Sequence, residues 1–251
     1  PTSNALALVR KVQFKIGRTG RITPILELEP VRLDDRQISR VSAGSLKRWQ
    51  ALDIRPGDQV SISLAGQVIP RLNQVILRNT TRVDLPVPNP RDFHALSCWQ
   101  LDPGCEEQLL ARLTWLSGNE GLALPHIGRE TWNVLIQAGL IAGFLDWLTL
   151  DAAELANIDG FGERSRTRLL DSLHRARQRP FAQWLKALGV PPAARSHLEG
   201  NWQTLVARDT QAWLAIDGIG PGRAAQLSAF FRDPHVQTLA ETLRVAGIDG
   251  F

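Results

Sequence analysis

Two five-residue segments share one pattern, Ile158-Asp-Gly-Phe-Gly162 and Ile216-Asp-Gly-Ile-Gly220, and their residue types and spacing suggest a binding chemistry. Glycines allow the left-handed backbone of a tight turn, and they place no side chain in front of the N–H groups that begin the next helix. Those N–H groups lie at the positive end of the helix dipole, where they can bind a phosphate. The alternative is a helical hairpin with a glycine turn and no ligand.

Two weaker copies of the pattern fall in register with the first two. His126-Ile127-Gly128 and Gly189-Val190-Pro191 align with them, so the anchor positions are 128, 162, 191 and 220, at intervals of 34, 29 and 29 residues. A repeat of this length corresponds to one supersecondary unit. The sequence therefore predicts four units, each made of a helix, a tight turn and a second helix.

Arginines close to these turns extend the candidate site. The chain has 29 Lys and Arg residues, of which only four are lysines, and the planar guanidinium group of arginine suits phosphate. The candidate phosphate-binding residues of the helical half are Gly128, Gly160, Gly162, Arg164, Arg166, Gly218, Gly220 and Arg223. Because phosphate contacts carry no base information, we expect binding without sequence preference and an affinity that falls as salt rises.

The first part of the chain has a different periodicity. Apolar and polar residues alternate from Arg10 to Ile16, which predicts a half-buried strand. Further strands are predicted at 22–28, after Pro30, at 60–64 and at 68–76, with a short helix that begins after a Ser45 N-cap. Five short strands with one interposed helix predict a small Greek-key barrel, most commonly an oligonucleotide-binding (OB) fold.

The predicted fold class is α+β and multidomain. We expect an N-terminal OB-fold β-barrel over 1–85, a linker region over 86–118, and an all-α domain of four helix-hairpin-helix repeats over 119–251. Three prolines in Pro86–Pro90 favour an extended, stiff connector that would set the separation of the barrel and the hairpins.

Composition excludes some classes and favours others. No apolar run approaches the roughly 18 residues that cross a bilayer, so no membrane association is expected. Two cysteines give no disulfide framework, which favours a reducing cytoplasm. The chain has no methionine and starts with Pro-Thr-Ser-Asn, which predicts that it is part of a longer polypeptide.

Several phrases of the first ninety residues resemble the barrel of the bacterial NAD⁺-dependent DNA ligases. They are Gly17-Arg-Thr-Gly20, Ile22-Thr-Pro24, Leu28-Glu-Pro-Val31, Gly57-Asp-Gln-Val60 and Ala65-Gly-Gln-Val-Ile-Pro70, and the order of a barrel followed by four hairpins is similar too. The resemblance implies that Arg18 and Thr19, flanked by Lys15 and Arg21, contact the DNA backbone. It also implies that Val68 and Ile69 press into the minor groove.

The same resemblance implies a function and partners. The family seals 5′-phosphate/3′-hydroxyl nicks during DNA repair and replication. An N-terminal nucleotidyltransferase domain of the same polypeptide uses NAD⁺ and a divalent cation for this chemistry. This chain lacks the family's Lys-x-Asp-Gly nucleophile, so we expect no catalytic residue, no bound cofactor and no ligase activity from it alone. We expect a monomer that binds nicked duplex DNA in the bacterial cytoplasm, associated with the nucleoid.

The chain also departs from the family pattern. Leu64 replaces an arginine that contacts DNA in the family. The family has a four-cysteine zinc site in the 86–118 region, where this chain offers only His94, Cys98 and Cys105. A structural zinc site requires four ligands, so we expect a metal-free region stabilised by apolar packing around Trp99 and Leu113. These departures resemble the short B-type branch of the ligases.

Two other classes remain open at this point. A non-enzymatic DNA-junction binder, similar to the Holliday-junction recognition protein, also combines an OB barrel with helical hairpins. A module of helical hairpins that binds only proteins is the third interpretation, and it predicts no DNA binding even at low salt.

Overall fold

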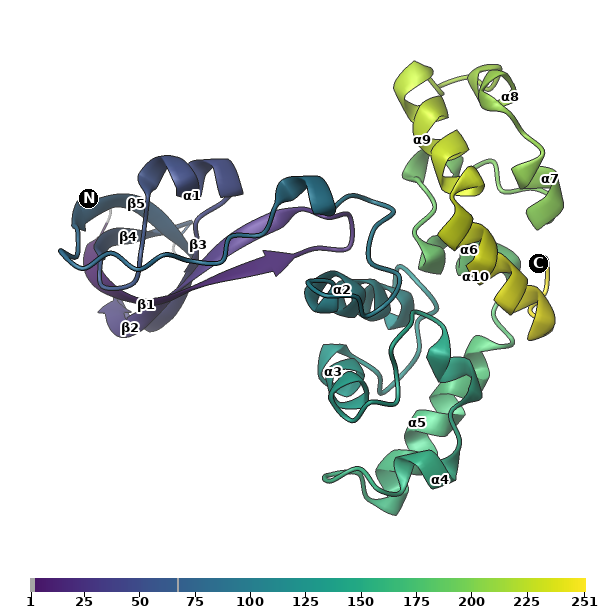
Figure 1. Ribbon diagram of the computed structural model, residues 1–251, viewed down its shortest axis with the longest axis horizontal. Coiled ribbons are helices and arrows are strands. Elements are labelled where there is room, and N and C mark those ends of the chain that lie inside the picture. Colours follow the sequence, from purple (N-terminus) through teal and green to yellow (C-terminus); the bar gives the residue numbers. More distant parts are fainter. Residues whose placement is uncertain (1–2, 67) are drawn as a thin grey trace. The chain divides into compact units, whose positions relative to one another are not determined.

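The computed structural model describes residues 3–66 and 68–251. It divides the chain into two compact units, Pro1–Ala95 and Leu96–Phe251, which are described separately (Figure 1). Unit 1 contains an antiparallel sheet and unit 2 is helical, so the α+β class is confirmed. Gln67, which belongs to the phrase Ala65–Pro70, lies outside the described residues.

Unit 1 is built on a five-stranded sheet in the order β3-β2-β1-β4-β5. Its elements are β1 (Asn4–Ile16), β2 (Ile22–Leu33), β3 (Arg36–Ser42), α1 (Leu46–Leu52), β4 (Gln59–Ala65) and β5 (Ile69–Leu77). The number of strands and the helix between β3 and β4 are confirmed, although β1 begins before Arg10. The expected break at Pro30 is wrong, because β2 continues through Pro30 to Leu33 and β3 begins at Arg36. Ser45 caps α1 as predicted, because its Oγ accepts a hydrogen bond from the Arg48 N–H at 3.0 Å.

The two end strands of the sheet approach each other and close the barrel. Arg36 at the start of β3 donates a hydrogen bond to the carbonyl of Val68, immediately before β5. The side chains that alternate inward, among them Leu26, Val60 and Ile62, are fully buried. Trp49 of α1 joins this core and donates its indole N–H to the Ile54 carbonyl at 2.9 Å.

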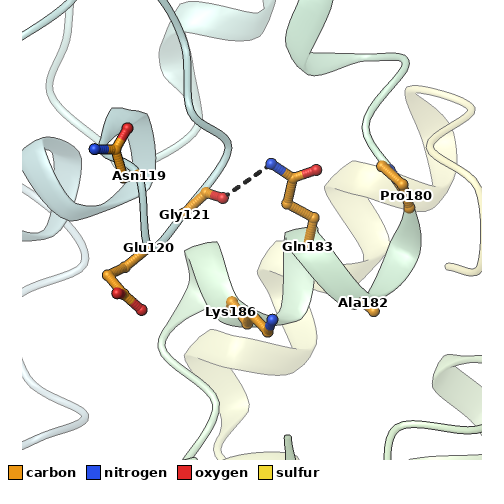
Figure 2. A pocket seen from close by; sticks show the side chains of 7 residues that line it. All are labelled: Asn119, Glu120, Gly121, Pro180, Ala182, Gln183 and Lys186. Atoms are coloured by element: carbon orange, nitrogen blue, oxygen red, sulfur yellow. Dashed lines mark hydrogen bonds between the residues drawn. The ribbon is translucent and has the colours of Figure 1, made fainter.

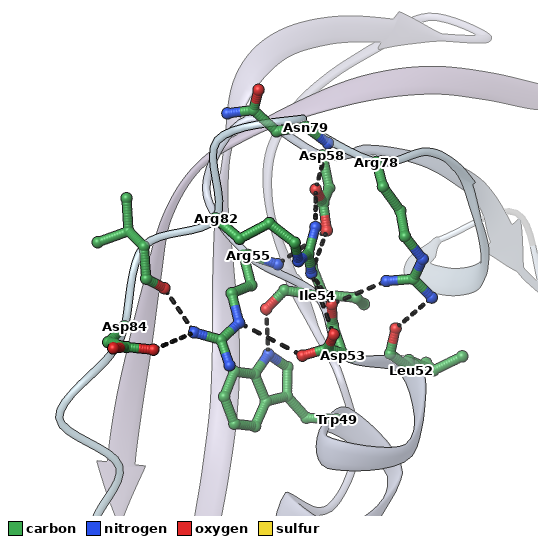
Figure 3. A network of polar contacts seen from close by, with 11 residues as sticks. Trp49, Leu52, Asp53, Ile54, Arg55, Asp58, Arg78, Asn79, Arg82 and Asp84 are labelled. Atoms are coloured by element: carbon green, nitrogen blue, oxygen red, sulfur yellow. Dashed lines mark hydrogen bonds and ion pairs between the residues drawn. The ribbon is translucent and has the colours of Figure 1, made fainter.

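A buried carboxylate fastens the chain that leaves β5 to the barrel (Figure 3). Asp58 is fully buried and accepts hydrogen bonds from the N–H groups of Asn79 at 2.8 Å and Arg55 at 3.0 Å, and from Arg82 Nη1 at 2.9 Å. Burial alone raises the pKa of Asp58, but these hydrogen bonds outweigh it and hold the pKa below its usual range.

The proline-rich segment continues along unit 1. Leu85 and Phe93, on either side of Pro86–Pro90, pack against the barrel core, and the 3-10 helix η1 (Pro90–Asp92) lies between them. The structure therefore places this segment inside the first unit, whose boundary follows Ala95. The division at 85 and 118 expected from the sequence stays a prediction.

Unit 2 consists of short helices. They are α2 (Glu106–Ser117), α3 (Arg129–Gln137), η2 (Asp146–Thr149), α4 (Ala152–Leu155), α5 (Glu163–Ala176), α6 (Phe181–Leu188), η3 (Pro192–Ala194), α7 (Trp202–Val206), α8 (Thr210–Leu214), α9 (Pro221–Arg232) and α10 (Pro234–Val245). Within the described residues, none of the helices has the length and apolar character that crossing a membrane requires.

Tryptophans form much of the core of unit 2. Trp132, Trp147, Trp184 and Trp213 are each at most 1% exposed, and the rings of Trp147 and Trp184 stack with centroids 6.1 Å apart. Large aromatic rings bury much apolar surface, and this burial packs the short helices of unit 2 against one another. These four tryptophans therefore serve packing.

Candidate nucleic-acid interface

Three of the four predicted turns share one backbone geometry. Gly128, Gly162 and Gly220 are the extended N-cap residues of α3, α5 and α9, and none of them supplies a side-chain cap. Two residues earlier, Gly160 and Gly218 both have a φ of 86° in the left-handed region. His126 takes the same position in the first copy with a φ of 62°, so a histidine replaces glycine there without changing the turn.

These helix starts present N–H donors that the helix itself does not use. The first hydrogen bonds inside α5 and α9 run from Arg166 N to the Gly162 carbonyl and from Ala224 N to the Gly220 carbonyl. The N–H groups of the preceding helical residues have no acceptor within the helix. A methyl group placed on Gly162 or Gly220 would meet no atom within 4 Å, so the surface in front of these donors is open.

The preceding helix, α8, has the side-chain N-cap that the glycine-capped helices lack. Asp209 caps α8 with a backbone at φ −83° and ψ −179°, and its carboxylate accepts from the Ala212 N–H at 2.8 Å. Gly220 has nearly the same backbone, φ −85° and ψ 177°, but no side chain to accept from its helix. The donors of α9 are thus available to an external anion, whereas those of α8 are partly satisfied internally.

Two of the candidate arginines bond to the backbone of their own turns, and a third is exposed at a helix start. Arg166 Nη1 donates to the Ala156 carbonyl at 3.4 Å, and Arg223 Nη1 donates to the Gly218 carbonyl at 3.2 Å, so both lie beside their own turns. Arg164 is exposed in the first turn of α5. That turn also contains the acidic Glu163, while the first turn of α9 contains no acidic residue. The local charge therefore favours an anion more strongly at α9 than at α5.

The third copy, one of the two weaker ones, lies at the C-terminal end of a helix, and among the described residues no α-helix begins directly after it. Gly189 has a φ of 89° and caps the C-terminus of α6, where Val190 N donates to the Leu185 carbonyl at 3.0 Å. The three-residue helix η3 follows, and the next α-helix begins only at Trp202. Glycine followed by an apolar residue occurs at both kinds of helix boundary, which explains the alignment in sequence.

The two complete turns lie far apart within unit 2. Figure 1 shows the α4–α5 corner at one end of the helical unit and the α8–α9 corner at the other. They cannot bind the same phosphate group. Any phosphates that they contact must belong to separate parts of a nucleic-acid backbone.

The candidate residues of unit 1 lie in two hairpins at opposite ends of β2. Arg18 and Thr19 form the β1–β2 turn, which is closed by a hydrogen bond from Gly17 N to the Arg21 carbonyl at 2.9 Å. Gly20 in this turn has a φ of 88°, and a Cβ there would lie 2.5 Å from the backbone N of His94. Lys15, Thr19 and Arg21 are exposed, and Arg18 is half-buried.

The second hairpin joins β4 to β5 and carries two apolar side chains. Val68 is 60% exposed and Ile69 66% exposed. Exposed branched apolar side chains at a hairpin tip have the shape of the wedges that some proteins press into a minor groove. Leu64, where the resemblance implied an arginine, is only 7% exposed and faces the barrel core.

Cross-strand pairing adds basic residues that the sequence analysis did not select. Lys11 on β1 lies opposite Glu27 on β2, which lies opposite Arg40 on β3, so the three side chains share one face. Arg40 also reaches Gln13 Oε1 at 3.3 Å. Lys11 and Arg40 are 29 positions apart and could not be placed on one face without the strand register.

The two cysteines are joined in a disulfide bond between Cys98 and Cys105, which corrects the expectation of no disulfide framework. Neither sulfur is then available as a thiolate for zinc. His94, the third potential ligand, belongs to unit 1, whereas both cysteines belong to unit 2. The described residues include no cluster of three or more potential metal ligands.

A buried arginine stabilises the region that carries this disulfide. Arg112 is 2% exposed, and its Nε and Nη2 donate to the Ser97 carbonyl at 3.1 and 2.7 Å. Its guanidinium carbon lies 3.7 Å from the centroid of the Trp99 ring. The disulfide, this arginine and the predicted apolar packing of Trp99 and Leu113 hold the loop together.

One pocket of unit 2 lies apart from the candidate residues. It has a volume of about 330 Å³ and lies between the loop after α2 and helix α6, with Glu120, Gln183 and Lys186 among its lining residues (Figure 2). Gln183 Nε2 donates to the Gly121 carbonyl across it at 3.1 Å. None of the predicted phosphate-binding residues lines this pocket, so it adds nothing to the candidate interface.

Comparison with known proteins identifies relatives along the whole chain. Residues 6–84 match the family described as the NAD-dependent DNA ligase OB-fold domain. "DNA ligase B" of Pseudomonas fluorescens (strain Pf0-1) is 69% identical over 251 residues, which are 100% of this chain and 45% of that protein. "DNA ligase B" of Pseudomonas putida (strain W619) is 54% identical over 251 residues, or 44% of its length. The chain thus spans less than half the length of these relatives.

Proposed function

This chain belongs to the NAD-dependent DNA ligase family and is similar to its DNA ligase B members, and we propose that it binds duplex DNA for such a ligase. In this proposal the chain is the C-terminal portion of the polypeptide. It holds a nicked duplex without sequence preference while another part of the protein seals the 5′-phosphate to the 3′-hydroxyl.

The observation that carries the proposal is the set of uncapped helix starts at α3, α5 and α9. Each presents main-chain N–H groups at the positive end of a helix dipole, behind a glycine that leaves space for a phosphate oxygen. Arg164 and Arg223 add positive charge beside two of them. We propose that these corners act as helix-hairpin-helix motifs, each contacting the sugar-phosphate backbone at a different place.

The barrel supplies the second contact surface. Its match to a ligase OB-fold domain supports a DNA-binding role for Lys15, Arg18, Thr19 and Arg21. We add Lys11 and Arg40, which share a face of β1–β3. The exposed Val68–Ile69 tip would enter the minor groove and deform the duplex locally. Because the two hairpins lie at opposite ends of β2, a duplex lying along this strand could contact both.

The covalent chemistry belongs to the part of the protein outside this chain. None of the four lysines stands in a Lys-x-Asp-Gly context, so the chain offers no nucleophile of the family's type for a nucleotide. We propose that a nucleotidyltransferase domain upstream in the same polypeptide uses NAD⁺ and a divalent cation. We propose that the Cys98–Cys105 disulfide takes the place of the family's zinc site, because it occupies both cysteines of the candidate ligand set.

The cellular setting follows from this role. We propose that the protein works as a monomer in the bacterial cytoplasm, associated with the nucleoid, in DNA repair or replication. The DNA-junction binder loses support as the alternative, since the matched relatives are named as DNA ligases.

A binding titration tests the proposed function. Fluorescence anisotropy of the 251-residue chain with nicked, intact and four-way DNA of equal length should give tight binding to both linear duplexes and a steep salt dependence. The full-length polypeptide should prefer the nicked duplex. A strong preference of the chain for four-way DNA would support the junction binder instead, and no binding at low salt would support the protein-interaction module.

A further inference from the structure

The outer face of the barrel carries large apolar side chains that the core does not use. Leu6 and Leu8 on β1 are 51% and 40% exposed, and Ile76 and Leu77 at the end of β5 are 51% and 59% exposed. The register places Leu8 opposite Gln59 of β4, and Gln59 opposite Leu77. Directly paired residues point to the same side of a sheet, so Leu8 and Leu77 lie on one face. Leu6, two residues before Leu8 on the same strand, points to this side as well, and Leu6, Leu8 and Leu77 are called the leucine face below.

The leucine face is chemically unlike the basic face of the same barrel. The residues that pair with Leu6 and Leu8 are the uncharged Ser61 and Gln59, and Gln74 continues the Leu6 row on β5. The basic face instead combines Lys11 and Arg40. The cations next to the leucine face in the sequence are already engaged, Arg10 with Glu29 and Arg78 with the Leu52 and Asp53 carbonyls. Aliphatic side chains gain nothing from phosphate groups, whereas clustered exposed apolar residues are typical of protein-binding surfaces.

We propose that the leucine face is the docking surface for the nucleotidyltransferase portion of the same polypeptide, an inference that rests on the proposed function. In the relatives, more than half of the length lies outside the part that this chain matches, so a large body of protein is available to cover the face. Leu6 and Leu8 belong to β1, the first element of the described chain. A domain joined ahead of β1 is held at high effective concentration beside them.

Docking there assigns separate tasks to the two faces of the barrel. The basic face and the glycine corners contact DNA, while the leucine face holds the portion that does the chemistry. A polar ladder bounds the leucine face, because Asn73 Nδ2 donates to Asn4 Oδ1 at 3.4 Å and Ser63 Oγ donates to Asn73 Oδ1 at 3.2 Å. An apolar centre with a polar margin is the usual composition of a specific protein interface.

Photocrosslinking in the full-length polypeptide tests the proposal. A benzophenone amino acid replaces Leu6 or Leu77, and in the control it replaces Val245, which is 73% exposed on α10 in unit 2. We expect the first two positions to form intramolecular crosslinks to residues outside this chain, and position 245 to form none there. Crosslinks to a second copy, to DNA or only within these 251 residues would overturn the proposal.

A pair of variants measures the contribution of the leucines. Leu8→Ser with Leu77→Ser should reduce the crosslink yield from position 6 by about tenfold or more, since each buried leucine contributes on the order of a factor of ten. Val245→Ser is the matched control and should leave the yield unchanged. An unchanged yield in a double variant with wild-type thermal unfolding would contradict the docking.

The same variants separate this proposal from the proposed function. In the isolated 251-residue chain, Leu8→Ser with Leu77→Ser should bind nicked duplex like the wild type, because the leucine face does not contact DNA. A loss of that binding would overturn the assignment of the face to protein. Normal DNA binding without crosslinks would leave the DNA-binding function standing and remove only the docking proposal.

Discussion

An aspartate at the glycine N-caps should block DNA binding without weakening the fold. The change is Gly162→Asp together with Gly220→Asp. Asp209 already caps α8 on a backbone that differs from that of Gly220 by only a few degrees, so the new side chain can accept from its own helix in the same way. It would occupy the donors intended for phosphate and place a negative charge in front of them.

The expected loss of DNA affinity follows from the number of phosphate contacts that the aspartates remove. A hydrogen bond to a charged group contributes about 1.5 kcal/mol or more, so losing one phosphate contact per turn weakens binding by about tenfold. The two corners lie at opposite ends of unit 2, and their effects should add to about a hundredfold in the double variant. The melting temperature should stay the same or rise slightly, because aspartate is at least as good an N-cap as glycine.

Two controls accompany the anisotropy assay. Gly162→Ala with Gly220→Ala adds a methyl group in open space and leaves the donors unoccupied, so affinity should stay within about threefold. Gly218→Ala instead forces a side chain onto a φ of 86° and should destabilise the fold by about 1 kcal/mol. Wild-type affinity in a well-folded double aspartate variant would refute the role of the glycine corners.

Three further predictions concern the salt dependence, the barrel and the disulfide. With about six phosphate contacts, a plot of log Kd against log salt should have a slope of about 5, and a slope near zero would contradict phosphate binding. Asp58→Asn should lower the free energy of unfolding by about 2 kcal/mol, whereas the exposed Asp84→Asn should change it by less than about 0.5 kcal/mol. Because the folded pKa of Asp58 is depressed, its stabilisation is present at neutral pH and is lost as the pH falls below about 4, which urea titrations across pH can measure. Reducing the Cys98–Cys105 disulfide should destabilise unit 2 by about 2 kcal/mol in calorimetry and leave the barrel transition in place; equal shifts of both transitions would be the opposite result.

Local signals in the sequence predicted the elements well. Alternation from Arg10 to Ile16 and the Ser45 cap are short-range features, and both correspond to the strand and helix found. The paired glycines at 160/162 and 218/220 likewise predicted left-handed turns before α5 and α9, because a left-handed backbone followed by an uncapped helix start strongly favours glycine. Similarity to a DNA ligase B covers all 251 residues, beyond the barrel that the family model matches.

Features that depend on distant residues could not be predicted in this way. Gly189 was placed among the turns because a glycine before an apolar residue looks the same at the end of a helix as before its start. The pairing of Lys11 with Arg40 through Glu27 depends on strand register, and the ion pair between the buried Asp58 and the partly exposed Arg82 joins residues 24 positions apart. The two cysteines lie close in sequence, but their pairing could not be predicted without the loop conformation. In that loop Arg112 donates to the carbonyl of Ser97, next to Cys98.

Phosphate binding at the glycine corners is tested most directly by observing the main-chain N–H groups of α5 and α9. In an amide ¹H–¹⁵N titration with a short nicked duplex, the N–H signals of Arg164, Gly222 and Arg223 should shift strongly and saturate together with the β1–β2 turn. The N–H of Ala212, which Asp209 already satisfies in α8, should stay unchanged. If the first-turn amides of α5 and α9 do not move at saturating DNA, the glycine corners do not bind phosphate and the central claim is wrong.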